Sequence, residues 1–143
     1  MEKKNKSLLA LSFSKGFTSP NIPIITISQG NRELNFILDT GSDRNIIDSN
    51  ILPLLEHTQH KGGESIALTG VGGTKKVQIC SITFQIKEES YTADFLVSDM
   101  KDAFSAVKEA SAVHLHGILG SEFLRSNKIV LDFSSMVAYN DKK

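Results

Sequence analysis

The chain is organised around Phe36-Ile37-Leu38-Asp39-Thr40-Gly41-Ser42-Asp43, an apolar run that ends abruptly in an acid, a hydroxyl and a glycine. From Leu34 to Leu38 every second residue is apolar, which is the period of a β-strand. Asp39 therefore falls where a buried strand runs out into a turn. A carboxylate there loses solvation and needs donors, and Gly41 lets backbone N–H groups approach it without a Cβ in the way. The pattern predicts a positioned acid that can act as a base.

Three classes of active site have an acid at the end of a strand. The residue two positions after Asp39 distinguishes between them. An aspartyl-phosphate phosphatase needs a second acid there, and a metal site of the Asp-x-Ser-x-Ser type needs a serine, but Gly41 occupies the position. The remaining pattern, Asp-Thr-Gly-Ser after a hydrophobic strand, resembles the active-site turn of aspartic proteases.

Two further segments carry the same resemblance. The second signature of the retropepsins, an apolar pair and a glycine followed by a short helix, is matched by His116-Gly117-Ile118-Leu119-Gly120-Ser121-Glu122-Phe123-Leu124. Between the two signatures lies Leu68-Thr69-Gly70-Val71-Gly72-Gly73-Thr74, a glycine-rich hairpin tip where that family carries its flap. The three features follow the family's order over roughly residues 22–139. The chain is therefore similar to retropepsin-like aspartic proteases of cellular, viral or mobile-element type.

The resemblance implies a fold and a set of site residues. The fold would be mainly β, a closed retropepsin-like (acid protease) β-barrel with short helices that forms one half of a two-fold dimer. Asp39, Thr40 and Gly41 would be catalytic, with the Thr40 hydroxyls crossing the two-fold axis and the Gly41 N–H groups directed at the carboxylates. No metal or organic cofactor is expected. The residues expected to bind substrate are Ser42, Asp43, Gly70, Val71, Gly72, Gly73, Gly117, Ile118 and Leu119.

A single acid implies two chains. Aspartic proteolysis needs one ionised carboxylate to take a proton from water and one protonated carboxyl group to polarise the peptide carbonyl. Two carboxyl groups about 3 Å apart cannot both ionise near neutrality, because their negative charges repel, so the pair shares one proton. The chain holds one Asp-Thr-Gly, and its nearest imitation, Asp132-Phe133-Ser134, lacks the glycine. The second Asp39 must come from another copy, which predicts an isologous homodimer.

One departure limits the analogy with the retroviral members of the family. Those members pair the acid after Asp-Thr-Gly-Ala with an arginine directly after the second glycine. Here Asp43 is present, but Ser121 stands where the arginine would be. A viral dimer interface and substrate preference are therefore not assumed, and the partner of Asp43 stays open between Arg44 and Arg125.

Length and composition limit the number of domains, the partners and the cellular location that we expect. At 143 residues there is room for one core, and we expect a flexible N-terminal arm or leader over 1–18 and a single protease domain over 19–143. The 16 basic and 16 acidic side chains cancel, which disfavours nucleic acid and an anionic membrane as partners. The short apolar part of the arm is too small for an export signal, and nothing approaches a membrane span, so a cytoplasmic location is expected. Cys80, the one cysteine, is expected to be a small buried hydrophobe.

Periodicity predicts the other elements. A bulge near Cys80-Ser81 would reconcile two apolar registers in one long strand, and Ser121 would cap the helix after the second glycine. The expected elements are a hairpin over 22–28 and 33–38, a short helix from near Ile51 to about Glu56, flap strands over 65–69 and 74–79, strands over 82–86 and 91–97, a helix over 99–113 capped by Asp99 or Asp102, a helix over 122–127, and a strand pair from 129 to about 139.

Two pairs of histidines allow a second interpretation. His57 and His60, and His114 and His116, have spacings that a metal could use, but no further ligand is suggested nearby, and a solvated loop and a polar strand face are the simpler explanations.

Two functions remain open at this stage. The first is an endopeptidase that prefers hydrophobic side chains around the cut, since the expected pocket residues are mostly apolar. The second is a retropepsin-shaped peptide-binding or assembly module with little turnover, which would hold an extended peptide by strand addition.

Overall fold

The computed structural model describes residues 11–12, 22–60, 65–70 and 73–140. Within these ranges the helices are α1 (Lys101–Ser111) and α2 (Ser121–Ser126), and a single 3-10 turn, η2, covers Leu52–Leu54. The strands are β1 (Leu11–Ser12), β2 (Ile24–Gln29), β3 (Arg32–Asp39), β4 (Asn45–Asp48), β5 (Thr58–Gln59), β6 (Ser65–Gly70), β7 (Gly73–Ile86), β8 (Glu89–Ser98), β9 (Gly117–Gly120), β10 (Ile129–Asp132) and β11 (Val137–Asn140).

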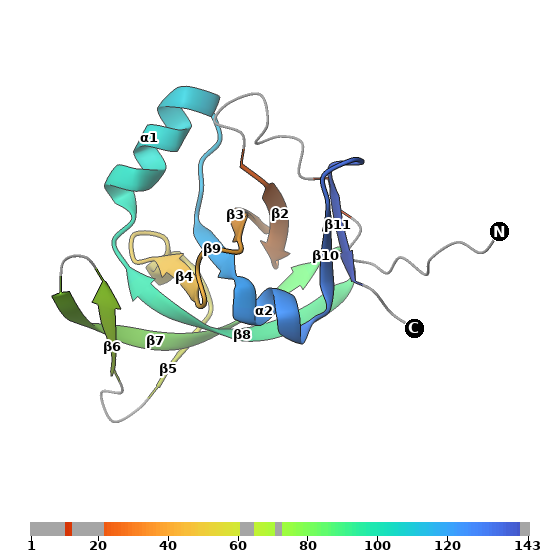
Figure 1. The fold of residues 1–143 in the computed structure, drawn as a ribbon. Coiled ribbons are helices and arrows are strands. Elements are labelled where there is room, and N and C mark those ends of the chain that lie inside the picture. The colour runs from red at the N-terminus through yellow and green to blue at the C-terminus, as the bar shows by residue number, and fades with distance from the viewer. Residues whose placement is uncertain (1–10, 13–21, 61–64, 71–72, 141–143) are drawn as a thin grey trace.

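The sheet closes on itself to form a barrel. Its strand order is β2-β3-β9-β4-β8-β7, and β7 pairs back to β2 where Ser28 lies opposite Gln85. Strand β3 runs parallel to β9 and β4 runs parallel to β8, whereas the other pairings around the barrel are antiparallel. The predicted mainly β, closed barrel with short helices is confirmed (Figure 1).

The inward-facing side chains of the strands fill the barrel and form its core. Phe36, Phe84 and Phe95 are fully buried at its centre, with Phe36 and Phe84 stacked at 6.4 Å between ring centroids and Phe95 edge-on to both. Such ring pairs add specific attraction to the burial of apolar area. Cys80 is also fully buried here, as predicted from its neighbours.

A second apolar cluster lies on the outer face of the barrel and holds α1 in place. Phe104 of α1 is buried with Leu115 and Ile118, and the half-buried Ile37 and Ile46 pack against them. Because Ile37 alternates with the core residues of β3, it faces the opposite side of the sheet. The predicted helix over 99–113 is confirmed with shorter bounds, and it ends at Ala112 in a left-handed conformation (φ 64°).

Some local predictions were wrong. The expected helix to about Glu56 is only the turn η2, whose first positions hold Pro53. No bulge interrupts the β7–β8 pairing, which runs unbroken from Gln78 opposite Val97 to Ile86 opposite Glu89. The two apolar registers instead face opposite sides, since the even-numbered residues from Cys80 onward are buried and Ile79 is half-buried on the other face.

The termini form a small sheet at one side of the barrel. Strand β11 lies between β10 and β1, with Leu11 opposite Ala138, so the predicted final strand pair is confirmed. The predicted arm, residues 1–18, lies outside the described residues except for this short strand. Figure 1 shows this sheet on the right and the β6–β7 hairpin projecting on the left. No helix in the described ranges is long and apolar enough to cross a membrane.

Candidate active site

Asp39 is the last residue of β3, and its carboxylate is held by the turn that follows. Its side chain is half-buried, and Oδ1 accepts a 2.9 Å hydrogen bond from the Gly41 N–H. A Cβ at Gly41 would lie 3.2 Å from that same oxygen. The absence of a side chain at Gly41 therefore leaves the backbone N–H close to the carboxylate, as the sequence predicted.

The remaining residues of the turn differ in exposure. Thr40 and Asp43 are exposed, and Ser42 is half-buried with its hydroxyl donating to the carbonyl of Arg44 at 2.8 Å. The Ser42 N–H donates to the Asp39 carbonyl at 3.2 Å. The turn is thus stabilised by its own polar groups while Thr40 stays on the surface.

Gly120 lies directly beneath this turn. It is the partner of Asp39 in the parallel β3–β9 pairing, and a Cβ added to it would come within 2.5 Å of the Arg44 carbonyl oxygen and 2.6 Å of the Ser42 carbonyl oxygen. No real Cβ approaches backbone atoms so closely, so only glycine fits. The second glycine signature therefore supports the Asp-Thr-Gly turn by close approach.

The turn is also tied to the start of α2. The Ser121 N–H donates to the Ser42 carbonyl at 2.7 Å, and the Glu122 N–H donates to the Asp43 carbonyl at 3.2 Å. Gly120, not Ser121, is the N-cap of α2, and Ser121 makes no capping hydrogen bond. The role predicted for Ser121 as a cap was wrong, because its backbone is engaged with the turn.

Neither arginine proposed for Asp43 binds its carboxylate. Within the part of the chain that the structure describes, Asp43 forms no ion pair within 4 Å, and its side chain is exposed. The connection between turn and helix that an acid–arginine pair would supply is made by backbone hydrogen bonds instead.

Asn45 belongs to the site in a structural role that the sequence analysis did not predict. This buried side chain donates from Nδ2 to the Asp94 carbonyl at 3.0 Å and accepts at Oδ1 from the Gly120 N–H at 2.9 Å. It therefore joins β8 and β9 behind the turn. A polar residue directly before the apolar pair Ile46-Ile47 was the available signal.

The expected substrate-binding residues on β9 divide between the two faces of the sheet. Leu119 is fully buried in the core, which removes it from any surface that a substrate could touch. Ile118 faces the outer side beside Ile37 and Ile46. Gly117 faces the core, as Leu119 does, and a Cβ there would lie 2.7 Å from the Ile46 carbonyl oxygen and 2.9 Å from the Phe36 ring. Gly70 ends β6 and Gly73 begins β7. Val71 and Gly72 lie outside the described residues.

His116 is a buried neutral side chain. Its Nδ1 accepts a 2.9 Å hydrogen bond from the Asn35 N–H, so that nitrogen carries no proton. Burial, assisted by the nearby His114, lowers the pKa of His116 to about 4. The two rings lie 4.7 Å apart. His116 thus serves the β3–β9 region as a hydrogen-bond acceptor.

The other predicted histidine pair is occupied by local hydrogen bonds. His57 Nδ1 lies 2.8 Å from the Leu55 carbonyl oxygen, and His60 Nε2 lies 3.1 Å from the Ser81 hydroxyl. No cluster of three or more His, Cys, Asp or Glu side chains suited to a metal ion occurs among the described residues.

Comparison with known proteins gives one family and one fold. The family model described as retroviral aspartyl protease matches residues 19–132. Among solved structures, the EIAV protease complexed with the inhibitor HBY-793 is 21% identical, and the alignment covers 76% of this chain and 89% of that chain with a TM-score of 0.53. No curated protein sequence matches significantly. At 21% identity, the structural similarity supports a common fold and nothing more.

Proposed function

The chain belongs to the retroviral aspartyl protease family, and on that premise we propose that it is an aspartic endopeptidase whose active site forms between two copies of the chain. The observation that carries the proposal is the Asp39 carboxylate at the end of β3, which accepts the Gly41 N–H and is supported from beneath by Gly120. The strand and the glycine together fix where the acid points.

The chemistry follows from pairing two such acids. One Asp39 carboxylate is ionised and takes a proton from water, while the other is protonated and donates a hydrogen bond to the peptide carbonyl oxygen. The water oxygen bonds to the carbonyl carbon, and the carbonyl oxygen takes the proton. The carbon–nitrogen bond then breaks as the nitrogen receives the proton that came from water, and one hydroxyl of the tetrahedral intermediate returns a proton to the other carboxylate. This releases an acid and an amine and leaves the dyad with one proton, as at the start. No covalent intermediate with the enzyme forms.

The second carboxylate would come from a two-fold related copy. Each chain holds one Asp-Thr-Gly, and Thr40 is exposed beside Asp39, where it can meet its equivalent across the axis. In this arrangement each subunit contributes one Asp39, one Thr40 and one β6–β7 hairpin to a shared cleft.

The preferred substrate would carry apolar side chains near the cut. Ile37 lies two residues before Asp39 on the same face of β3, and it packs with Ile46 and Ile118 on the outer surface of the barrel. These side chains form an apolar floor beside the acid, which favours apolar over charged groups.

Substitution of the acid tests the proposal. Asp39→Asn keeps the shape of the side chain but removes its ability to accept a proton, so cleavage of a peptide library between about pH 4 and 7 should fall at least about a thousandfold. Asp102→Asn, the same change on the exposed surface of α1, is the matched control. Unchanged cleavage by Asp39→Asn would rule out the assignment, and binding of peptides without cleavage by the wild type would favour the peptide-binding module.

A further inference from the structure

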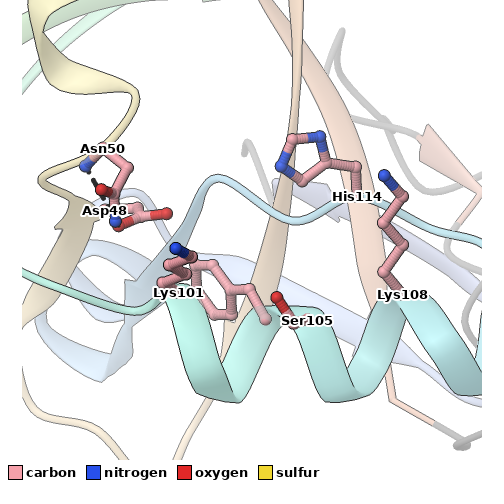
Figure 2. A pocket seen from close by; sticks show the side chains of 7 residues that line it. Asp48, Asn50, Lys101, Ser105, Lys108 and His114 are labelled. Carbon is pink, nitrogen blue, oxygen red and sulfur yellow. Dashed lines mark hydrogen bonds between the residues drawn. The ribbon is translucent and has the colours of Figure 1, made fainter.

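A pocket of about 240 Å³ lies between α1 and the end of β4, away from Asp39 (Figure 2). Lys101, Ser105 and Lys108 follow one another along one face of α1 and, as Figure 2 shows, stand across the pocket from Asp48 and His114. The buried ring of Phe104 completes the wall on the helix side. The pocket thus combines an apolar wall with groups of both charges.

Only one of the two carboxylate oxygens of Asp48 accepts hydrogen bonds from the described residues. Its side chain is 6% exposed. Oδ1 accepts hydrogen bonds from the Asn50 N–H at 3.2 Å, from Asn50 Nδ2 at 2.8 Å and from the Met100 N–H at 3.1 Å. Oδ2 accepts none from any residue in the described ranges, although Asp48 lines the pocket. Oδ2 can accept a hydrogen bond from a ligand, so a ligand with an N–H group fits this end.

The helix side of the pocket is cationic. Lys101 and Lys108 are exposed, and neither is ion-paired within 4 Å to another residue that the structure describes. His114 and Ser105 also line the pocket, and both side chains can donate a hydrogen bond. Asp48 in the lining and Asp99, which accepts from Asn50 Nδ2 at 2.8 Å and from the Lys101 N–H at 3.0 Å, offset the charge of Lys101. The positive charge therefore lies with Lys108, on the His114 side of the pocket in Figure 2, where it suits an anionic group.

The pocket is aligned with the candidate active site along the sheet. The Asp48 N–H donates to the His116 carbonyl at 3.0 Å, and the His116 N–H donates to the Asn35 carbonyl at 2.9 Å, so Asp48 is level with Asn35 on β3. Asn35 precedes Asp39 by four residues, which is about 13 Å at the rise of a β-strand. Ile37 lies between these two residues on β3, half-buried on the outer face of the barrel.

We propose that this pocket binds an acidic side chain of the peptide substrate, about four residues from the bond that is cut. An aspartate or glutamate in an extended peptide offers both groups that the pocket needs. Its backbone N–H meets Asp48 Oδ2, and its side-chain carboxylate meets Lys101, Lys108 and His114. The proposal rests on the proposed peptidase function and adds a specificity site to it.

A scan of peptides tests the pocket. Glutamate is moved one position at a time along an otherwise uncharged peptide with an apolar centre, and each peptide is compared with its glutamine twin. The wild type should cleave one glutamate peptide about fivefold faster in kcat/KM than its twin, the size expected of a partly solvated ionic hydrogen bond. Lys101→Glu and Lys108→Glu should each abolish that preference, so that the glutamate peptide and its glutamine twin are cleaved at equal kcat/KM. Lys87→Glu, the same charge change on the exposed β7–β8 turn, should preserve it.

A binding measurement separates this proposal from the peptidase assignment. Asp39→Asn protein is titrated with the same peptides, and the NMR signals of the His114 ring and of α1 are followed. These signals should shift with a glutamate peptide and not with its glutamine twin, whether or not the wild type cleaves either. Cleavage of no peptide by the wild type would overturn the peptidase assignment alone. Equal shifts, no shifts, or a glutamate preference that survives both lysine reversals would overturn the pocket.

Discussion

Asn45 Oδ1 accepts a 2.9 Å hydrogen bond from the N–H of Gly120, the residue that pairs with Asp39 across β3 and β9. The Asn45 side chain also reaches β8 through its bond to the Asp94 carbonyl. One buried amide therefore joins β4 to β8 and β9 around the acid, six residues after Asp39 in the sequence.

Asn45→Ala should destabilise the fold by about 2 kcal/mol, because the buried Gly120 N–H and Asp94 carbonyl each lose their partner. Urea unfolding followed by circular dichroism measures the change, and peptidase activity should fall under conditions where the variant is still folded. Asn31→Ala, on the exposed β2–β3 turn, should change stability by less than about 0.5 kcal/mol. Equal stability of the two variants would contradict this role for Asn45.

Gly120→Ala should be more damaging, at about 3 kcal/mol or more, since its Cβ would collide with the carbonyl oxygens of Arg44 and Ser42. The Asp-Thr-Gly turn must move to relieve the collision, so activity should be lost even in the folded fraction. Gly30→Ala is the matched control: its φ of +60° makes alanine strained, but nothing lies within 4 Å of the added Cβ. That variant should lose about 1 kcal/mol of stability and keep its activity.

Stability should decline in acid because of His116. Its pKa is about 4 in the fold and about 6.5 when unfolded, so between these values the unfolded chain binds a proton that the folded chain does not. Neutral His116 makes its full contribution to the free energy of unfolding above pH 6.5. This contribution is lost as the pH falls to about 4, a change of about 3 kcal/mol. Urea midpoints across this range measure it.

His116→Gln is the control for that titration, since glutamine can still accept a hydrogen bond but does not titrate. The variant should show a shallower loss of stability between pH 6.5 and 4. Identical slopes for the variant and the wild type would show that other groups cause the acid sensitivity.

The Cys80 thiol should be unreactive in the native protein. It is fully buried, and burial, with a smaller effect of Asp94, raises its pKa to about 11, so little thiolate forms near neutrality. Labelling with a disulfide reagent should be at least about a hundredfold slower in buffer than in denaturant. Fast native labelling would mean that the barrel opens around β7 far more often than its core packing indicates.

Peptidase activity should fall faster than linearly on dilution, because the proposed active site takes Asp39 from two chains and a dimer dissociates by mass action. Specific activity measured over a dilution series, with sedimentation at the same concentrations, tests this. A protein that stays monomeric at every concentration yet remains fully active would exclude the shared site.

Local patterns were enough to predict much of the architecture. The β2–β3 hairpin follows from alternation on either side of Gly30, and α1 follows from the change of period at Phe104 and Val107. The position of Asp39 at a strand end was predicted for the same reason, since it depends only on neighbouring residues.

The contacts that close the barrel could not be predicted from the local spacing of apolar residues. The pairing of Ser28 with Gln85, the bond from Asn45 to Gly120 and the engagement of Asp48 with Met100 join residues far apart in the chain. The bulge near Cys80 was wrongly predicted because alternation cannot say whether a strand is covered on one face or on both.

The parallel pairing of β3 with β9 also sets the order in which the parts of the candidate site can assemble during synthesis. A nascent chain that has exposed only the first signature has a hairpin but no strand to place beside it, and the support beneath Asp39 does not yet exist. Because such distant pairings form late, the ribosome releases most of these residues before the acid has its support.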